Sequence, residues 1–315
     1  MTALSNSSTM HSVTIVEVGP RDGFQAIVPF IETATKIELI GGLIGAGFKR
    51  LEIGSFVSPR AIPQMADIRS VMTAFQGVEN PALAVLVPNA RGVEHALQAG
   101  AKHLVYVISA SETHNRRNVS RSIEQSLSDF ASTMREVGGD VRLRFNLATA
   151  FDCPFEGTTP LKQVLRIVSE VLQHRPDAEI CLCDTTGKAS PTEVSRAFES
   201  CLGEFPDTTF AYHGHDTYGM GVSSSWAAYC AGVRIFDASV AGLGGCPFAP
   251  GATGNVASED LVFMFEQSGI STGIDLPKLV EQALQAAAIE GAVTGGAIRK
   301  VLGRPTEHVR ACPAA

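Results

Sequence analysis

The chain has 315 residues, of which 45% are hydrophobic and 18% are charged, so it is long and apolar enough to bury a large core. Its 25 Lys and Arg residues against 32 Asp and Glu residues give a net charge of -7, which argues against binding to nucleic-acid phosphates. No apolar run reaches the roughly 18 residues that cross a bilayer, so we expect neither a nucleic-acid nor a membrane partner.

The first 12 residues are polar and rich in Ser and Thr, without the features of a secretory signal or a transit peptide. We therefore expect a flexible segment at 1–12 and a cytoplasmic protein. From residue 13 onward, short β-branched apolar runs alternate with longer amphipathic runs, a rhythm typical of parallel βαβ units. Strands are predicted at 13–18, 50–53, 82–87, 103–108, 141–147, 179–183, 209–213 and 236–240.

Helices are predicted between these strands, where each would form a crossover connection. Eight β/α units in about 250 residues are the count of a (β/α)8 TIM barrel, which is an α/β fold. We predict a TIM-barrel catalytic domain at 13–270 and a C-terminal helical extension, packed on the barrel, at 271–315. The clearest helices are expected at 33–46, 90–99, 123–137, 160–174, 191–202 and 276–289.

Polar side chains are concentrated where the predicted strands end. The active site of such a barrel is built from the loops that follow the carboxyl ends of its strands, so these residues are candidates for chemistry. They are Arg21 and Asp22 after the first strand, Glu52 in the second, Asp184 and Lys188 after the sixth, His213 and His215 at the end of the seventh, and the Gly-rich loop 241–255 after the eighth.

His213 and His215 are two residues apart, so on a strand both imidazoles point to the same face and can bind one ion. Closure of the barrel would bring Asp22 and Asn255 beside them. Two imidazoles, a carboxylate and an amide oxygen suit Mg²⁺ or Mn²⁺ better than zinc, and open positions would take substrate oxygens. For an isolated pair, the alternative is two histidines that only form hydrogen bonds at the barrel mouth.

Two further residues have both a structural and a catalytic interpretation. Arg21 either pairs with Asp22 or Glu52, or it stabilises the charge of a developing oxyanion. Cys246 lies in the Gly-rich loop, where a thiol over a cationic site is suited to proton transfer or nucleophilic attack. The six other cysteines are interpreted as reduced and inert. Neither a dinucleotide fingerprint nor a P-loop is present in the sequence.

Several motifs, in the same order along the chain, resemble those of the hydroxymethylglutaryl-CoA lyases, a family among the metal-dependent lyase and aldolase TIM barrels. The resemblance covers nearly all of residues 13–300. The motifs are VEVGPRDGFQ (16–25), FVSPRAIPQM (56–65), CPFEG (153–157), HGHDTYG (213–219) and DASVAGLGGCPFAPGATGNVASEDLV (237–262). The resemblance implies metal ligands at Asp22, His213, His215 and Asn255, and catalytic residues at Arg21, Glu52, Asp184, His213 and Cys246.

The resemblance also implies the reaction, a retro-Claisen cleavage of 3-hydroxy-3-methylglutaryl-CoA into acetyl-CoA and acetoacetate. A divalent metal would lower the pKa of the C3 hydroxyl, a base would remove its proton, and breaking the C2–C3 bond would leave a thioester enolate. Arg21 would stabilise the enolate oxygen, and Cys246 would protonate the carbon. A homodimer, an acyl-CoA substrate and a place in leucine catabolism are implied as well.

Departures from the family pattern leave the acyl group open. Lys188 either meets a carboxylate or phosphate of the substrate or is solvated. The alternatives are a lyase for a longer 3-hydroxy-3-alkylglutaryl-CoA, an aldolase for a 4-hydroxy-2-oxo acid, and a catalytically silent barrel with a binding role. The departures are Gly214 for Cys, Met220 for Gln, Lys188 for an apolar residue, and Ala26 with Ile27 for an Asn-Glu pair.

Overall fold

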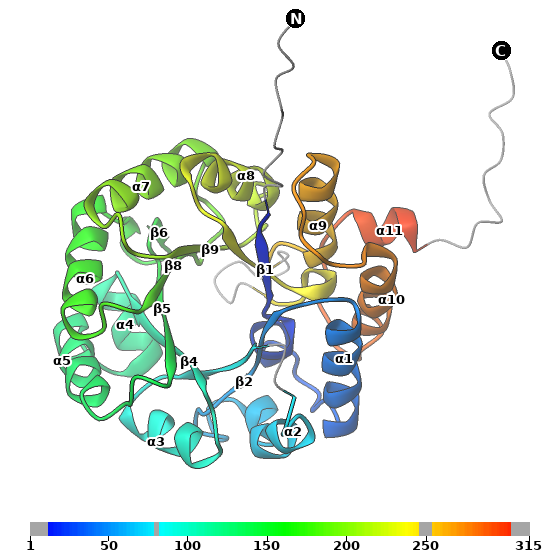
Figure 1. The fold of residues 1–315 in the computed structure, drawn as a ribbon, viewed down its shortest axis with the longest axis horizontal. Coiled ribbons are helices and arrows are strands. Elements are labelled where there is room, and N and C mark those ends of the chain that lie inside the picture. The colour runs from blue at the N-terminus through cyan, green and yellow to red at the C-terminus, as the bar shows by residue number, and fades with distance from the viewer. Residues whose placement is uncertain (1–11, 79–81, 246–253, 304–315) are drawn as a thin grey trace, which may run out of the picture.

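The computed structural model describes residues 12–78, 82–245 and 254–303, and in them eight parallel strands close into a barrel (Figure 1). Each barrel strand pairs with the next barrel strand in the chain, and β1 closes the cylinder by pairing with β10. The predicted (β/α)8 barrel is therefore confirmed. The strands are β1 (Thr14–Glu17), β2 (Arg50–Ser55), β3 (Ala82–Val87), β4 (His103–Ser109), β5 (Arg142–Ala148), β8 (Glu179–Asp184), β9 (Phe210–Gly214) and β10 (Ile235–Ala238).

Helices follow the strands and form the outer ring of the barrel (Figure 1). Every strand and helix that the sequence predicts is present, with ends within three residues of those expected. The helices of the ring are α1 (Thr33–Gly45), α2 (Ile68–Ala74), α3 (Ala90–Gln98), α4 (Glu112–Val119), α5 (Ile123–Met134), α6 (Leu161–His174), α7 (Pro191–Glu204), α8 (Gly221–Ala231) and α9 (Ser258–Gln267).

Local sequence signals explain where some of these helices begin. At the start of α7, the Ser190 side chain accepts the backbone N–H of Glu193, while the Glu193 side chain accepts the backbone N–H of Ser190. This reciprocal capping satisfies two N–H groups that a helix leaves without partners, and Pro191 suits the first helical position. A short hairpin, β6 (Asp152–Cys153) and β7 (Gly157–Thr158), lies between β5 and α6 and was not predicted.

Two helices after the barrel pack against its first and last helices (Figure 1). α10 (Leu276–Ala287) contacts α1 and α9, and α11 (Ile298–Leu302) contacts α9 and α10. The backbone N–H of Asp275 donates to the carbonyl of Ala46, and that of Gly295 donates to Ala241. The described part of this region therefore shares its core with the barrel. Across the described ranges, no helix has both the length and the apolar character needed to cross a bilayer.

Candidate metal centre

A tight turn after β1 sets the position of Asp22. The turn is one turn of π-helix, η1 (Gly19–Gly23), and Pro20 near its start fixes the backbone angle that begins it. The carbonyl of Val18 accepts the backbone N–H of Asp22 at 2.7 Å and that of Arg21 at 3.1 Å. Residues 21 and 22 thus stay at the carboxyl end of the barrel, where the active sites of TIM barrels lie.

The carboxylate of Asp22 faces the two imidazoles. The Oδ2 atom lies 4.0 Å from Nε2 of His213, on β9, and 4.0 Å from Nε2 of His215, just beyond it. One ligand atom from each of the three residues lies within 4.8 Å of the others. A separation of 4.0 Å is too long for a hydrogen bond, and the three atoms are close enough together to surround one ion. The structure therefore brings together three of the four predicted ligands in a possible metal-binding triad.

The fourth predicted ligand, Asn255, adjoins the same carboxylate. Its Nδ2 donates to Oδ2 of Asp22 at 2.8 Å and to the carbonyl of Leu243 at 3.1 Å. Its Oδ1 is buried without a hydrogen-bond partner among the described residues. A buried amide oxygen without a partner is costly, and a half-turn of the amide would bring that oxygen to Asp22 and a shared cation. The donor set of one carboxylate, two imidazoles and one amide oxygen fits a divalent ion.

A close approach between two backbone segments holds Asn255 in place. A β-carbon at Gly254 would lie 2.5 Å from the carbonyl carbon of Gly244, so only glycine fits there. The N–H of Asp216 donates to the carbonyl of Gly254 at 2.8 Å, and Asn255 forms an isolated bridge with His215. The Gly-rich sequence therefore lets this segment lie directly against the chain that follows β9.

Arg21 is paired with both neighbouring acids, as its structural interpretation predicts. Its Nε donates to Oε1 of Glu52 at 2.8 Å, its Nη2 donates to Oε2 at 3.1 Å, and its Nη1 contacts Asp22. Both Arg21 and Glu52 are buried. Burial raises the pKa of Glu52, although the charge of Arg21 partly offsets the shift. Burial also tends to raise the pKa of Asp22, but the charges of Arg21 and the imidazoles have the larger effect. Its pKa is therefore well below its usual value, and this carboxyl stays ionised.

Asp237 is a residue that the sequence analysis missed. It lies on β10 directly beside His213, and its Oδ2 is 3.1 Å from the Nδ1 atom of that imidazole. Its Oδ1 accepts a hydrogen bond from Nη1 of the buried Arg144 at 2.7 Å. A carboxylate behind an imidazole fixes which ring nitrogen faces a metal. Asp237 is the first residue of the last family motif. A carboxylate on the strand next to that of His213 could therefore have been predicted from the sequence.

The two imidazoles have opposite pKa shifts. Burial lowers the pKa of His213, but the hydrogen bond to Asp237 and the nearby Cys183 and Asp22 raise it to about 9. Burial and the charge of His213 lower the pKa of His215 to about 4. Without an ion, the pair therefore carries a single positive charge near neutral pH, and a cation bound by both imidazoles would displace the proton of His213.

The other predicted catalytic residues do not join this cluster. The strand register places Asp184 beside Gly214 rather than beside either histidine, and its carboxylate accepts the N–H of Ala189 at 3.1 Å. Burial raises the pKa of Asp184 to about 6. Lys188 is half exposed, with Nζ 3.6 Å from Oδ2 of Asp152. Cys246 lies outside the described residues.

A family model described as HMGL-like matches residues 12–284. The chain belongs to the HMGL-like family. The resemblance that the motifs carry is confirmed, and this HMGL-like chain is a carbon–carbon lyase. The match spans every strand of the barrel and all four predicted metal ligands.

Named relatives of this HMGL-like lyase include two different activities. The (R)-citramalyl-CoA lyase of Chloroflexus aurantiacus is 43% identical over 283 residues, which are 86% of this chain and 89% of that protein. A hydroxymethylglutaryl-CoA lyase of Bacillus subtilis is 41% identical over 276 residues, covering 86% and 91%. An HMG-CoA lyase from Acinetobacter baumannii, solved with coenzyme A and 3-methylmalate, superposes with a TM-score of 0.89 at 39% identity, covering 98% of each chain.

Proposed function

We propose that this HMGL-like lyase cleaves 3-hydroxy-3-methylglutaryl-CoA into acetyl-CoA and acetoacetate, with Mg²⁺ or Mn²⁺ held by Asp22, His213, His215 and Asn255. The proposal rests on one observation, the convergence of a carboxylate and two imidazoles at the carboxyl end of the barrel. The relatives named hydroxymethylglutaryl-CoA lyases, at 39–42% identity, support the substrate class.

The residues around the centre have roles that this reaction needs. A bound divalent cation would act as a Lewis acid toward the hydroxyl and carboxylate oxygens of the substrate. Arg21 has five N–H groups, and its three contacts with Glu52 and Asp22 leave two to donate to the thioester oxygen. These donors would stabilise the negative charge that develops there. Asp237 holds Nδ1 of His213, so that Nε2 faces the cluster.

The proposed cleavage moves one proton and one electron pair. The C3 hydroxyl gives its proton to a base as its oxygen forms the carbonyl of acetoacetate, and the C2–C3 electron pair passes to the thioester as an enolate. A proton then returns to C2 and gives acetyl-CoA, so no oxidant or reductant is needed. Asp184 and Cys246 are proposed for these proton transfers, with Cys246 returning the proton to C2, and His213 would contribute to catalysis as a ligand of the cation.

A second candidate substrate is citramalyl-CoA. The relative at 43% identity is named an (R)-citramalyl-CoA lyase, and this chain departs from the hydroxymethylglutaryl-CoA lyase pattern at Gly214, Met220 and Lys188. In citramalyl-CoA the carboxylate is attached directly to the carbon that bears the hydroxyl. The same bond cleavage would therefore give pyruvate and acetyl-CoA.

An assay of both thioesters with the Mn²⁺-loaded enzyme tests the proposal. We expect acetyl-CoA together with acetoacetate from the hydroxymethylglutaryl thioester. Pyruvate formed only from citramalyl-CoA would replace the first substrate by the second. Activity on neither thioester, with no bound metal in the purified protein, would favour a silent barrel. Turnover of a 4-hydroxy-2-oxo acid that free CoA does not inhibit would favour an aldolase.

A pair of histidine variants tests the metal ligands themselves. We expect His215→Ala to lose bound Mn²⁺ and turnover, because it removes a ligand of the cluster. His95→Ala is the matched control, since His95 lies on α3 and is not in the cluster. Full activity and metal content in His215→Ala would contradict the proposed site.

Three further parts of the proposal rest on the sequence alone. We propose a homodimer, a cytoplasmic location and a place in leucine catabolism. Sedimentation of the purified protein tests the first, fractionation of the source cells tests the second, and growth of a deletion strain on leucine tests the third.

A further inference from the structure

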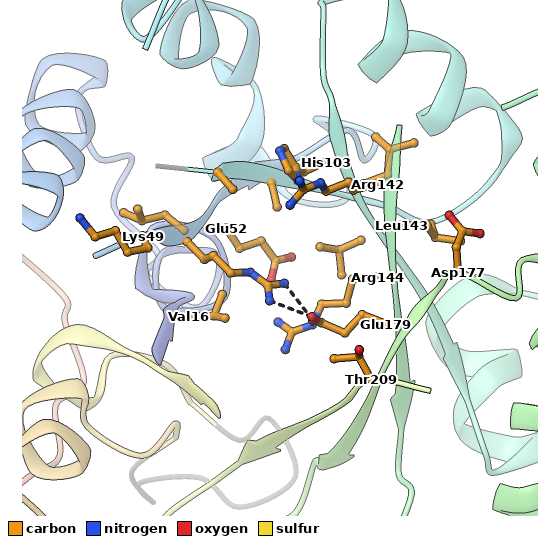
Figure 2. A pocket seen from close by; sticks show the side chains of 16 residues that line it. Val16, Lys49, Glu52, His103, Arg142, Leu143, Arg144, Asp177, Glu179 and Thr209 are labelled. Atoms are coloured by element: carbon orange, nitrogen blue, oxygen red, sulfur yellow. Dashed lines mark hydrogen bonds and ion pairs between the residues drawn. The ribbon is translucent and has the colours of Figure 1, made fainter. Parts of the chain in front are cut away.

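A cavity of about 380 Å³ opens at the amino-terminal end of the barrel, opposite to the candidate metal centre (Figure 2). It is lined by side chains from the starts of the strands. Arg50 begins β2, His103 begins β4, Arg142 begins β5 and Glu179 begins β8. The proposed lyase chemistry uses none of these four residues.

The cavity is lined by more positive charge than its own acids balance. Four cationic residues line it, while Glu52 and Asp177, which also line it, are already bound by Arg21 and Arg175 from outside the lining. That leaves Glu179 as the lining acid that these cations share, while Arg144 also pairs with Asp237, which is outside the lining. The four cations are Lys49, Arg50, Arg142 and Arg144.

Glu179 is engaged by two of the four cations. Arg50 donates to both carboxylate oxygens of Glu179, at 2.7 and 2.8 Å, and reaches them across the barrel from β2. The Nε of Arg144 forms an ion pair with Oε1 of Glu179 at 2.8 Å. Lys49 and Arg142 are exposed, and neither forms an ion pair with any residue of the described ranges. Two positive charges at this cavity therefore lack an ion-pair partner in the described part of the chain.

Arg144 supplies a buried donor without a partner. Arg144 is 5% exposed. Its Nη2 has no hydrogen-bond partner among the described residues, whereas its Nε contacts Glu179 and its Nη1 contacts Asp237. A buried donor without a partner destabilises the protein unless a ligand or water supplies that partner. Figure 2 shows Arg144 beside Glu179 on one side of the cavity, and His103 with Arg142 on the other. Donors on both sides therefore line this cavity, together with the carboxylate of Glu52.

The titration of His103 agrees with this charge distribution. Burial lowers its pKa, and the charges of Arg142 and Arg50 lower it further. A neighbouring positive charge disfavours a second one, so the imidazole is held in its neutral form. His103 can then donate one hydrogen bond to an anion without adding a charge.

We propose that this cavity binds a small dianion, such as phosphate or a short dicarboxylate, through Lys49, Arg142 and Arg144. The two cations without counter-charges match two negative charges, and the partnerless Nη2 of Arg144 adds a directed hydrogen bond. A cavity of about 380 Å³ accommodates either kind of molecule. The site is independent of the proposed lyase reaction, so failure of one of the two proposals would not contradict the other.

Calorimetric titration of the Mg²⁺-loaded protein tests the site, with inorganic phosphate in one arm and succinate in the other. We expect a dissociation constant in the millimolar range or below for at least one of them. Arg142→Ala and Lys49→Ala should each weaken that binding about tenfold, because each removes one charged contact. Lys102→Ala is the matched control, because Lys102 precedes His103 but does not line the cavity. It should bind like the unchanged protein.

Three results would overturn the proposal. The first is no binding of either anion by the unchanged protein. The second is equal weakening by Lys102→Ala and Arg142→Ala, which would indicate a diffuse charge effect. The third is loss of binding in His215→Ala, which would place the anion at the metal centre. Binding of phosphate alone supports the site and identifies a phosphate ligand, and binding of succinate alone supports it and identifies a dicarboxylate.

Discussion

The imidazole of His213 is held between two carboxylates, Asp22 on the side of the candidate metal and Asp237 on the side of the barrel interior. The substitution Asp237→Asn would keep the shape of this side chain and remove its negative charge. We expect the affinity for Mn²⁺ to fall about 10–100-fold, because the imidazole loses the partner that orients it and raises its basicity. Mn²⁺ titration followed by electron paramagnetic resonance measures the change.

The same variant also removes a counter-charge of the buried Arg144. An unfolding curve of Asp237→Asn must therefore show that the variant is folded before its metal affinity is compared. Asp177→Asn is the control, because Asp177 pairs with Arg175 at the opposite end of the barrel and should leave the affinity unchanged. A folded Asp237→Asn with undiminished Mn²⁺ affinity would contradict the positioning role.

Glu17 makes the stability of the protein depend on pH. It is fully buried, and burial raises its pKa from 4.5 to about 8 despite hydrogen bonds from Ser258, Val240 and Gly19. Between these pH values the folded protein keeps a proton that the unfolded chain releases. The contribution of this group to stability is therefore fully present below pH 4.5 and is lost as pH rises toward 8, by at most about 1.4 kcal/mol per pH unit.

Glu17→Gln cannot ionise, and its amide can still accept from Gly19 and Val240 and donate to Ser258. We expect the free energy of unfolding to fall less between pH 5 and pH 8 in this variant than in the unchanged protein. Urea unfolding at both pH values measures it. The exposed Glu38→Gln is the control, and a pH slope in Glu17→Gln as steep as in that control would refute the assignment.

At the scale of the element, β9 explains one departure from the family pattern. A β-carbon at Gly214 would lie 2.8 Å from Cε1 of Tyr212, whose buried ring packs edge-on against Phe151 and Phe198. The ring therefore occupies the space that a cysteine at 214 would need. We expect Gly214→Cys to lower the free energy of unfolding by about 1–3 kcal/mol, as overpacking does.

Gly203→Cys is the matched control for this substitution, because nothing lies within 4 Å of a β-carbon added at Gly203 on α7. Chemical denaturation of both variants gives the comparison. Equal stability of Gly214→Cys and the unchanged protein would show that the Tyr212 ring moves aside easily, and that the departure has another cause.

The strands and helices were more predictable from the sequence than the turns or the details of the site. Apolar periodicity gave all eight strands, because each strand must bury residues against the helices around it. The π-turn at Gly19–Gly23 and the β6–β7 hairpin were not predicted, since a single turn and two-residue strands have no period to detect. The predicted strand at 236–240 ends earlier, at Ala238, because a 3₁₀ turn (Val240–Gly242) follows it.

In the candidate site, only the features that follow from the order of the strands were predictable from the sequence. Barrel closure brings the loop after β1 near the end of β9, so Asp22, His213 and His215 were grouped correctly from their strand positions alone. Topology does not set side-chain direction within a loop. The amide orientation of Asn255 and the attachment of Asp184 to its own loop therefore emerged only from the three-dimensional structure.

At the scale of the whole molecule, the candidate ion would connect three distant parts of the chain. Asp22 follows the first strand, His213 and His215 end the seventh, and Asn255 precedes the last barrel helix. These parts flank the pair β1 and β10, which closes the barrel. A ligand that binds only the folded state stabilises it, by about 2.7 kcal/mol at a hundred times its dissociation constant.

Removing the metal should therefore lower the melting temperature. At about 2.1 cal/mol/K of unfolding entropy per residue, 2.7 kcal/mol corresponds to about 4 °C for a chain of 315 residues. Calorimetric melting of the Mn²⁺-loaded protein, before and after treatment with a chelator, measures this shift. His215→Ala should melt at the same temperature with and without Mn²⁺, because it lacks a ligand that closes the site. A metal-dependent shift that persists in His215→Ala would place the stabilising ion elsewhere and separate barrel closure from metal binding.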